Sequence, residues 1–289
     1  MARDLAPLAI AGLLDSLPAR IDIHCAKIAG RHIFWHAPFI APLEQGRDVT
    51  ALPAGTFLYW PERQFLELIY GDLQAESAQV SVLGRLRGDV AWLRALGERV
   101  TRRQGHEVIW AELTAGQPGA SKAAGLQDAR PEAAWLRDKR YAALRQARIA
   151  IWQSEPDCIK RLASRRGIML PYGPLSMAEG EFRKLQELLW RLGSPLAVDF
   201  PPAERGRHAA FLIDAFLSRI VGLCGLHESG AVLEQAAALL RDHPDAAPAV
   251  LEEAILYAGR MAAWLDLYIP WHTLNERVVD VQGAQGGMS

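Results

Sequence analysis

The apolar residues change their spacing partway along the chain, and this change restricts the fold more than any other feature. Up to about residue 175, short β-rich runs are interrupted by glycine and proline, as in residues 20–36, "RIDIHCAKIAGRHIFWH". Further on, apolar residues recur every three or four positions, which is the helical period. The sequence therefore predicts an α+β protein with a mixed first domain, residues 1–175, a helical bundle, residues 176–280, and a disordered tail, residues 281–289.

Further elements follow from local patterns. Strands are predicted at "GTFLYW", "QFLELIY", "HEVIWAEL", "RIAIWQ" and "CIKRLASR", and helices at "VAWLRALGERV", at 131–147 and at the four apolar-periodic segments 176–193, 203–224, 230–242 and 246–268. The stretch between them at about 114–130 is rich in Gly, Ala and small polar residues and predicts a mobile loop.

Composition excludes several classes of function. The formal net charge is −1, with no massed basic segment, so nothing favours a nucleic-acid partner. The three cysteines are far apart and lack metal-site spacing, which indicates reduced thiols in a cytoplasmic protein. The N-terminal apolar run is broken by Pro7 and Asp15 and predicts a helix rather than a signal peptide, and no run reaches the length of a membrane span.

No cofactor signature is present in the sequence. Glycine-rich nucleotide loops, GxSxG and HExxH are absent. The eight histidines show no metal spacing; His24, His32 and His36 have even spacing, but Gly30 interrupts the strand, so we interpret them as core or surface histidines. We expect no metal and no cofactor, which leaves acid–base chemistry on bound organic substrates.

Three segments are candidates for a site. Glu76 follows a strand that ends at Tyr70-Gly71, and it is either a positioned base or a surface acid. Ser164 and Arg165 end the run "RLASRRG", where they form either a carboxylate clamp or a solvated strand end. Most tryptophans, Trp92 and Trp264 among them, have core spacing, whereas Trp271 follows Pro270 past a helix end and is a candidate for lining a cleft.

Several blocks resemble the cucumopine-synthase-like family, which includes the bacterial Pictet–Spengler enzymes that build β-carboline skeletons from tryptophan. Residues 14–36, "AGTFLYW", "LIYGDLQAES" and "RLASRRG" resemble its cyclophilin-like β-barrel domain. Residues 254–272, "AILYAGRMAAWLDLYIPWH", resemble the closing helix and Pro-Trp of its helical bundle. The blocks lie in the family's order across nearly the whole chain, so the resemblance implies a cyclophilin-like β-barrel followed by a helical bundle.

The resemblance also suggests site residues. The family's catalytic base, a glutamate after the Tyr-Gly strand end, matches Glu76 with one inserted residue, and Asp72 is the rival candidate. The family's arginine before the Gly-Thr strand is matched by Arg47, and its strand histidine is replaced by Gln64 or Phe65. We expect Arg47 or Arg165 to bind a carboxylate and Trp271 to stack on an indole, with Gln64 and Ser164 as further substrate contacts.

The implied activity is condensation of L-tryptophan, or a substituted tryptophan, with an aldehyde or α-keto acid. Two alternatives remain open: condensation of L-histidine with an α-keto acid, and a non-catalytic small-molecule binding protein. The family's first β-hairpin is missing from this chain. The resemblance implies a homodimer, and the missing hairpin gives this a physical reason, because an exposed sheet edge is a site for pairing with another chain.

Overall fold

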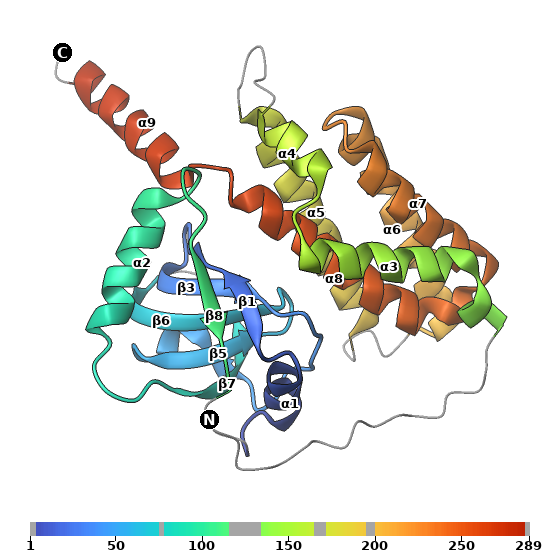
Figure 1. Ribbon diagram of the computed structural model, residues 1–289, viewed down its shortest axis with the longest axis horizontal. Helices are drawn as coiled ribbons and strands as arrows, with labels where there is room; N and C mark the ends of the chain where they lie inside the picture. The colour runs from blue at the N-terminus through green and yellow to red at the C-terminus, as the bar shows by residue number, and fades with distance from the viewer. Residues whose placement is uncertain (1–3, 75–77, 116–133, 165–171, 195–199, 287–289) are drawn as a thin grey trace. The chain divides into compact units, whose positions relative to one another are not determined.

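The computed structural model describes residues 4–74, 78–115, 134–164, 172–194 and 200–286. It divides into two compact units (Figure 1). The first comprises residues 1–37, 43–115 and 267–289, and the second comprises residues 38–42 and 116–266. The described residues combine helices and strands in an α+β fold whose C-terminal part is helical.

The first unit is built on a six-stranded antiparallel sheet. Its strands, in spatial order, are β2 (His24–Cys25), β3 (Gly30–His36), β6 (Phe65–Leu73), β5 (Thr56–Trp60), β7 (Gln79–Arg85) and β4 (Arg47–Asp48). A second, two-stranded sheet pairs β1 (Ala19–Asp22) with β8 (Trp110–Leu113). Pairing among the described strands does not close either sheet, so the cyclophilin-like barrel stays a prediction.

Side chains alternate between the two faces of the large sheet, as the pleat requires. One face packs on helix α2 (Ala91–Arg103) through Leu93 and Val100, which join Ile33 and Tyr70 in one apolar cluster. Figure 1 shows α2 beside β3 and β6. Gly97 of α2 faces Tyr70, and a Cβ at that position would overlap the tyrosine ring.

The opposite face holds a second apolar cluster. It contains Phe34, Val49, Leu58, Trp60, Phe65, Ile69, Ala78 and Val80, with Leu52 packed against it. Val49 belongs to the short helix η1 (Val49–Ala51) that follows β4. Two further helices complete the unit: α1 (Pro7–Asp15) and α9 (Trp271–Gly286), which extends over residues 281–286 of the predicted tail.

The second unit is helical. Its helices are η2 (Ala134–Arg137), α3 (Lys139–Gln153), α4 (Asp157–Ser164), α5 (Gly173–Gly193), α6 (Pro202–Gly222), α7 (His227–Asp242), η4 (Pro244–Ala246) and α8 (Ala247–Asp266). Helix α8 is central, since all but two of its 20 residues are buried and it packs against α3, α5, α6 and α7. Trp264 of α8 is buried and donates its indole N–H to the Ile151 carbonyl of α3 at 2.8 Å, as core packing predicts.

Three interpretations of the sequence differ from the structure. The predicted strands "RIAIWQ" and "CIKRLASR" are parts of helices α3 and α4. These helices belong to the second unit, so the helical region begins earlier than residue 176. Trp92 is 53% exposed rather than in the core. Most of the loop predicted at about 114–130 lies outside the described residues.

Candidate functional site

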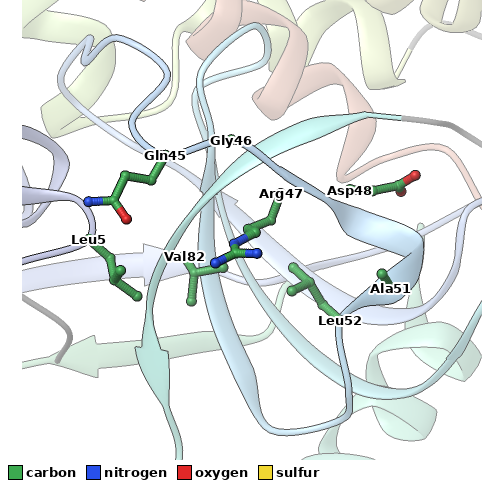
Figure 2. Close-up of a pocket in the computed structure, with 8 residues that line it drawn as sticks. All are labelled: Leu5, Gln45, Gly46, Arg47, Asp48, Ala51, Leu52 and Val82. Atoms are coloured by element: carbon green, nitrogen blue, oxygen red, sulfur yellow. The ribbon is translucent and has the colours of Figure 1, made fainter.

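A cavity of about 460 Å³ lies beside strands β4 and β7 of the first unit (Figure 2). Its lining residues are Leu5, Gln45, Gly46, Arg47, Asp48, Ala51, Leu52 and Val82. This volume falls within the range of small-molecule sites, and the combination of apolar walls with a few polar groups is typical of them. Of the residues predicted from the sequence to bind substrate, Arg47 lies at this cavity.

The loop before β4 is fastened at two points. The Glu44 carboxylate accepts hydrogen bonds from the backbone N–H groups of Leu8 and Ala9, at 2.9 Å each, in the first turn of α1. A carboxylate at this end of a helix also interacts favourably with the helix dipole. The Glu44 backbone N–H donates to Ser81 Oγ on β7 at 2.9 Å. Helix α1 and strand β7 therefore position Arg47, which pairs with Val80 of β7.

Arg47 supplies positive charge to the cavity. It makes no hydrogen bond or ion pair with another described residue, and Figure 2 shows its guanidinium directed toward Val82. The neighbouring Asp48 carboxylate accepts hydrogen bonds from Thr50 N and Oγ1, which lower the pKa of Asp48, and it points away from Arg47. A guanidinium in this setting can bind a carboxylate through two parallel hydrogen bonds.

Buried polar side chains lie on one face of the large sheet, the face that carries the apolar cluster with Phe34 and Phe65. His32, Phe34 and His36 alternate along β3, and Phe34 pairs with His24 on one side and with Glu67 on the other. All four polar residues of this group, His24, His32, His36 and Glu67, are at most 5% exposed. His24 stacks on Phe34 with ring centroids 5.1 Å apart. We refer to these four residues as the buried polar group.

His32 and Glu67 are the titratable side chains that approach each other within the buried polar group. His32 Nε2 lies 3.7 Å from Glu67 Oε2, beyond hydrogen-bonding distance. Burial lowers the pKa of His32 to about 4, so its imidazole is neutral at pH 7. His32 Nδ1 is buried and has no hydrogen-bond partner among the described residues. Perturbed, incompletely satisfied groups of this kind occur preferentially at functional sites.

The buried polar group was not predicted from the sequence. Gly30 does interrupt the strand, but it does so at a hairpin that returns β3 alongside β2, so His24 and the β3 histidines share one face. A detectable signal was present: Glu67 is the one charged residue within the apolar run 65–70, "FLELIY", and His32, Phe34 and His36 alternate strictly.

The other residues predicted to form the site lie elsewhere in the structure or outside the described residues. Gln64 is in the turn before β6, with φ 49°, and its side-chain amide donates to the Pro61 carbonyl; it does not line the cavity. Asp72 is exposed on β6. Glu76 lies outside the described residues.

Ser164 ends helix α4 of the second unit, where its hydroxyl donates to the Arg161 carbonyl. The expected strand end that would present Ser164 is therefore a helix end. Arg165 lies outside the described residues.

Trp271 begins helix α9 and is half-buried. The Lys27 ammonium lies 4.5 Å from the centre of its ring, in a cation–π contact. The next residue, His272, approaches Cys25 Sγ with Nε2 at 3.5 Å. These contacts hold the start of α9 on β2, and Trp271 is not among the residues that line the cavity.

Two features are absent from the described residues. No group of three or more His, Cys, Asp or Glu side chains has the arrangement of a metal site. Where the chain is described, none of its helices combines the length and apolarity needed to cross a membrane.

Comparison with known proteins places the chain in a structural class. No protein-family model and no curated protein sequence matches it. Among solved structures, its fold is similar to that of McbB in complex with tryptophan, with a TM-score of 0.76 and 20% sequence identity. The match covers 96% of this chain and 94% of McbB, so the two chains share one fold over nearly their whole lengths.

Proposed function

We propose that this protein is a Pictet–Spengler condensing enzyme that joins L-tryptophan, or a substituted tryptophan, to an aldehyde or α-keto acid and gives a tetrahydro-β-carboline. The observation that carries the proposal is the fold shared with a tryptophan-bound structure over 96% of the chain. The sequence resemblance to the cucumopine-synthase-like family supports the same reaction. We include in the proposal the family's cyclophilin-like barrel, a homodimer and a cytoplasmic location.

The cavity supplies a recognition element that suits this substrate. Arg47 would bind the amino-acid carboxylate through its guanidinium, while Leu52 and Val82 offer apolar contact to the ring. The substrate amine, held in this way, condenses with the carbonyl partner and releases water to form an iminium. A site with apolar walls protects that iminium from hydrolysis because it limits the access of water.

The remaining steps require a base. The electron-rich ring carbon attacks the iminium carbon and forms the new C–C bond, and the ring then loses a proton to regain aromaticity. We propose that Glu76 is the base that removes this proton, with Asp72 as the alternative. General-base catalysis typically raises the rate roughly 10²–10⁴-fold. For Trp271, Gln64, Ser164 and Arg165, the role of substrate contact is proposed from the sequence alone.

Mass spectrometry tests the reaction. Purified protein is incubated with L-tryptophan and a panel of aldehydes and α-keto acids, and each reaction is quenched with and without borohydride. The imine and its cyclised isomer have one mass, but borohydride reduces only the imine. We expect a borohydride-resistant product that Glu76→Gln abolishes. Absence of product above the protein-free rate with any partner would contradict the tryptophan activity.

The same panel separates the alternatives. Product with L-histidine and an α-keto acid, but not with tryptophan, would support the cucumopine-type reaction. If neither amino acid reacts although one of them binds, the protein belongs to the non-catalytic binding class. Loss of product in Glu76→Gln identifies Glu76 as the base only if the variant still binds tryptophan, which calorimetry measures.

A further inference from the structure

Gln45 is a second polar side chain that the Arg47 cavity offers to a ligand. It lies two residues before Arg47 and lines the same cavity (Figure 2). Asp48 also lines the cavity, but its carboxylate accepts hydrogen bonds from Thr50 and points away from Arg47. Among the described residues that line the cavity, Gln45 is therefore the one whose side chain can supply a hydrogen-bond acceptor to a ligand held by Arg47.

The orientation of the Gln45 amide is determined by its hydrogen bond to the main chain. The amide nitrogen Nε2 donates to the Asp4 carbonyl at 2.9 Å. A backbone carbonyl only accepts hydrogen bonds, so the nitrogen must face Asp4 and the oxygen Oε1 must face away from it. Oε1 makes no hydrogen bond with another described residue. It is therefore available to accept an N–H group of a ligand.

The backbone at Gln45 has an unfavourable conformation. Its φ of 44° lies in the left-handed region, which glycine adopts readily and other residues adopt rarely. The preceding residue, Glu44, fastens this loop to the first turn of α1 through its carboxylate and to Ser81 through its backbone N–H. Unfavourable backbone conformations that the surrounding structure maintains are concentrated at functional sites. A glutamine at a position that suits glycine thus indicates a role for its side chain.

We propose that Gln45 Oε1 accepts a hydrogen bond from the α-amine of the amino-acid substrate whose carboxylate is bound by Arg47. This inference rests on the proposed function and deepens it, because it identifies the residue that selects an α-amino acid over other carboxylic acids. The guanidinium has only donors, and the amide oxygen only accepts. The carboxylate and the amine of an α-amino acid present the complementary acceptor and donor from one carbon atom.

The hydrogen bond from the amine also serves the reaction. An ammonium group has three N–H donors and a neutral amine has two, so Gln45 can hold the substrate before and after it loses this proton. When one N–H is held, the direction of the amine lone pair is restricted. That lone pair forms the C–N bond to the carbonyl partner in the condensation, and such orientation lowers the entropic part of the barrier.

Three points of contact make the site chiral. Arg47 binds the carboxylate, Gln45 binds the amine, and the apolar lining residues Leu5, Leu52 and Val82 contact the ring. Figure 2 shows Val82 between Leu5 and Arg47. The mirror-image amino acid cannot place all three of its groups on these contacts at once. Removal of the Gln45 side chain should therefore reduce the discrimination between the two enantiomers of tryptophan.

Calorimetry with two ligands tests the amine contact. L-Tryptophan is compared with indole-3-propionic acid, which keeps the ring and the carboxylate but lacks the amine. We expect the wild type to bind tryptophan roughly 5–20-fold more tightly, because the analogue loses one charge-assisted hydrogen bond. Gln45→Gly should bind the two ligands about equally. Because glycine suits the left-handed backbone at this position, the variant should keep its fold, which circular dichroism checks.

D-Tryptophan gives a second readout. The ratio of the affinities for L- and D-tryptophan should be smaller in Gln45→Gly than in the wild type. A merely structural role of Gln45 would weaken the binding of all three ligands by the same factor. Gln235→Ala is the matched control, because Gln235 is an exposed glutamine of helix α7 in the second unit, and it should leave every affinity ratio unchanged.

The outcomes distinguish the two proposals. Equal affinity of the wild type for L-tryptophan and indole-3-propionic acid would overturn the Gln45 contact and leave tryptophan as the substrate. Affinity ratios that Gln45→Gly leaves unchanged would do the same. Failure of the wild type to bind tryptophan at all would overturn the proposed function together with the contact.

Discussion

Arg47 shows how a single residue can be assigned a binding role from its surroundings. Asp48, the next residue along the chain, is engaged by Thr50, and the guanidinium lies in a cavity that also has apolar residues in its lining. An arginine that stabilised the fold would instead have a partner carboxylate, as Arg148 has in Glu253 at 2.7 Å. The positive charge at the cavity is therefore available to a ligand.

Replacing Arg47 by Met is expected to weaken L-tryptophan binding roughly 10–100-fold, because one charge-assisted hydrogen-bonded pair is lost. Arg47→Lys should show an intermediate loss, since lysine keeps the charge but not the bidentate geometry. Calorimetry measures both affinities. Tryptamine, which lacks the carboxylate, is the matched ligand, and Arg47→Met should not weaken its binding; an equal loss for both ligands would show that Arg47 acts on the fold.

His32 predicts a pH dependence of stability. Its pKa is about 4 in the folded protein and about 6.5 when exposed, so the unfolded chain binds a proton at a higher pH than the folded one. The folded state therefore has its full stability, as far as His32 determines it, above pH 6.5. As the pH falls to 4, protonation of His32 in the unfolded chain lowers the free energy of unfolding by at most about 3 kcal/mol.

Urea denaturation at several pH values measures this effect. His32→Phe, which cannot titrate, should have a shallower fall of unfolding free energy between pH 6.5 and 4 than the wild type. His106→Asn is the control, because His106 is exposed in the same unit. Parallel curves for the wild type and His32→Phe would show that the burial of His32 does not determine the acid sensitivity.

At the scale of elements, helix α2 depends on a glycine where helix propensity favours alanine. Gly97→Ala would gain about 1 kcal/mol of intrinsic propensity, but the added methyl group overlaps the Tyr70 ring. Overpacking of this kind typically costs 1–3 kcal/mol. We expect net destabilisation of up to about 2 kcal/mol, measured by urea denaturation.

Gly180 of helix α5 provides the matched substitution. A Cβ at that position meets nothing within 4 Å, so Gly180→Ala should stabilise the protein by roughly 0.5–1 kcal/mol. The two substitutions should change the free energy of unfolding in opposite directions if the space around the glycine, rather than helix propensity, determines the effect. If Gly97→Ala also stabilised the protein, α2 would not be seated against Tyr70 as described.

The sequence predicted elements well where the alternation was long and poorly where it was short. The strands around 30–36, 56–60 and 65–73 follow from their alternating or apolar runs and flanking glycines. The run "RIAIWQ" has only six residues, over which helical and strand periods are hard to separate, and it is the last part of helix α3.

The candidate site could be predicted only in part from the sequence, for a related reason. The resemblance singled out Arg47, which lines the cavity, but the buried polar group depends on which strands pair. The partnership of Phe34 with both His24 and Glu67 joins segments more than thirty residues apart along the chain. No local pattern encodes such a register, because side-chain facing follows from pairing as well as from alternation.

At the scale of the whole molecule, the two units differ in how the chain builds them. The first unit combines three separate segments, 1–37, 43–115 and 267–289, so it requires both ends of the chain. Apart from residues 38–42, the second unit is one continuous segment, 116–266. Its central helix α8 is surrounded by α3, α5, α6 and α7, all of which lie within that segment.

Expressed alone, residues 134–266 should therefore fold into a helical bundle. Circular dichroism should show that this fragment unfolds cooperatively on heating. This fragment should not bind L-tryptophan in calorimetry, because every residue that lines the cavity lies between Leu5 and Val82. The full-length protein is the matched control. If the fragment bound tryptophan with the affinity of the full-length protein, the site would belong to the helical unit, where Ser164 lies. If the fragment had no helical structure, the second unit would need the first unit to fold.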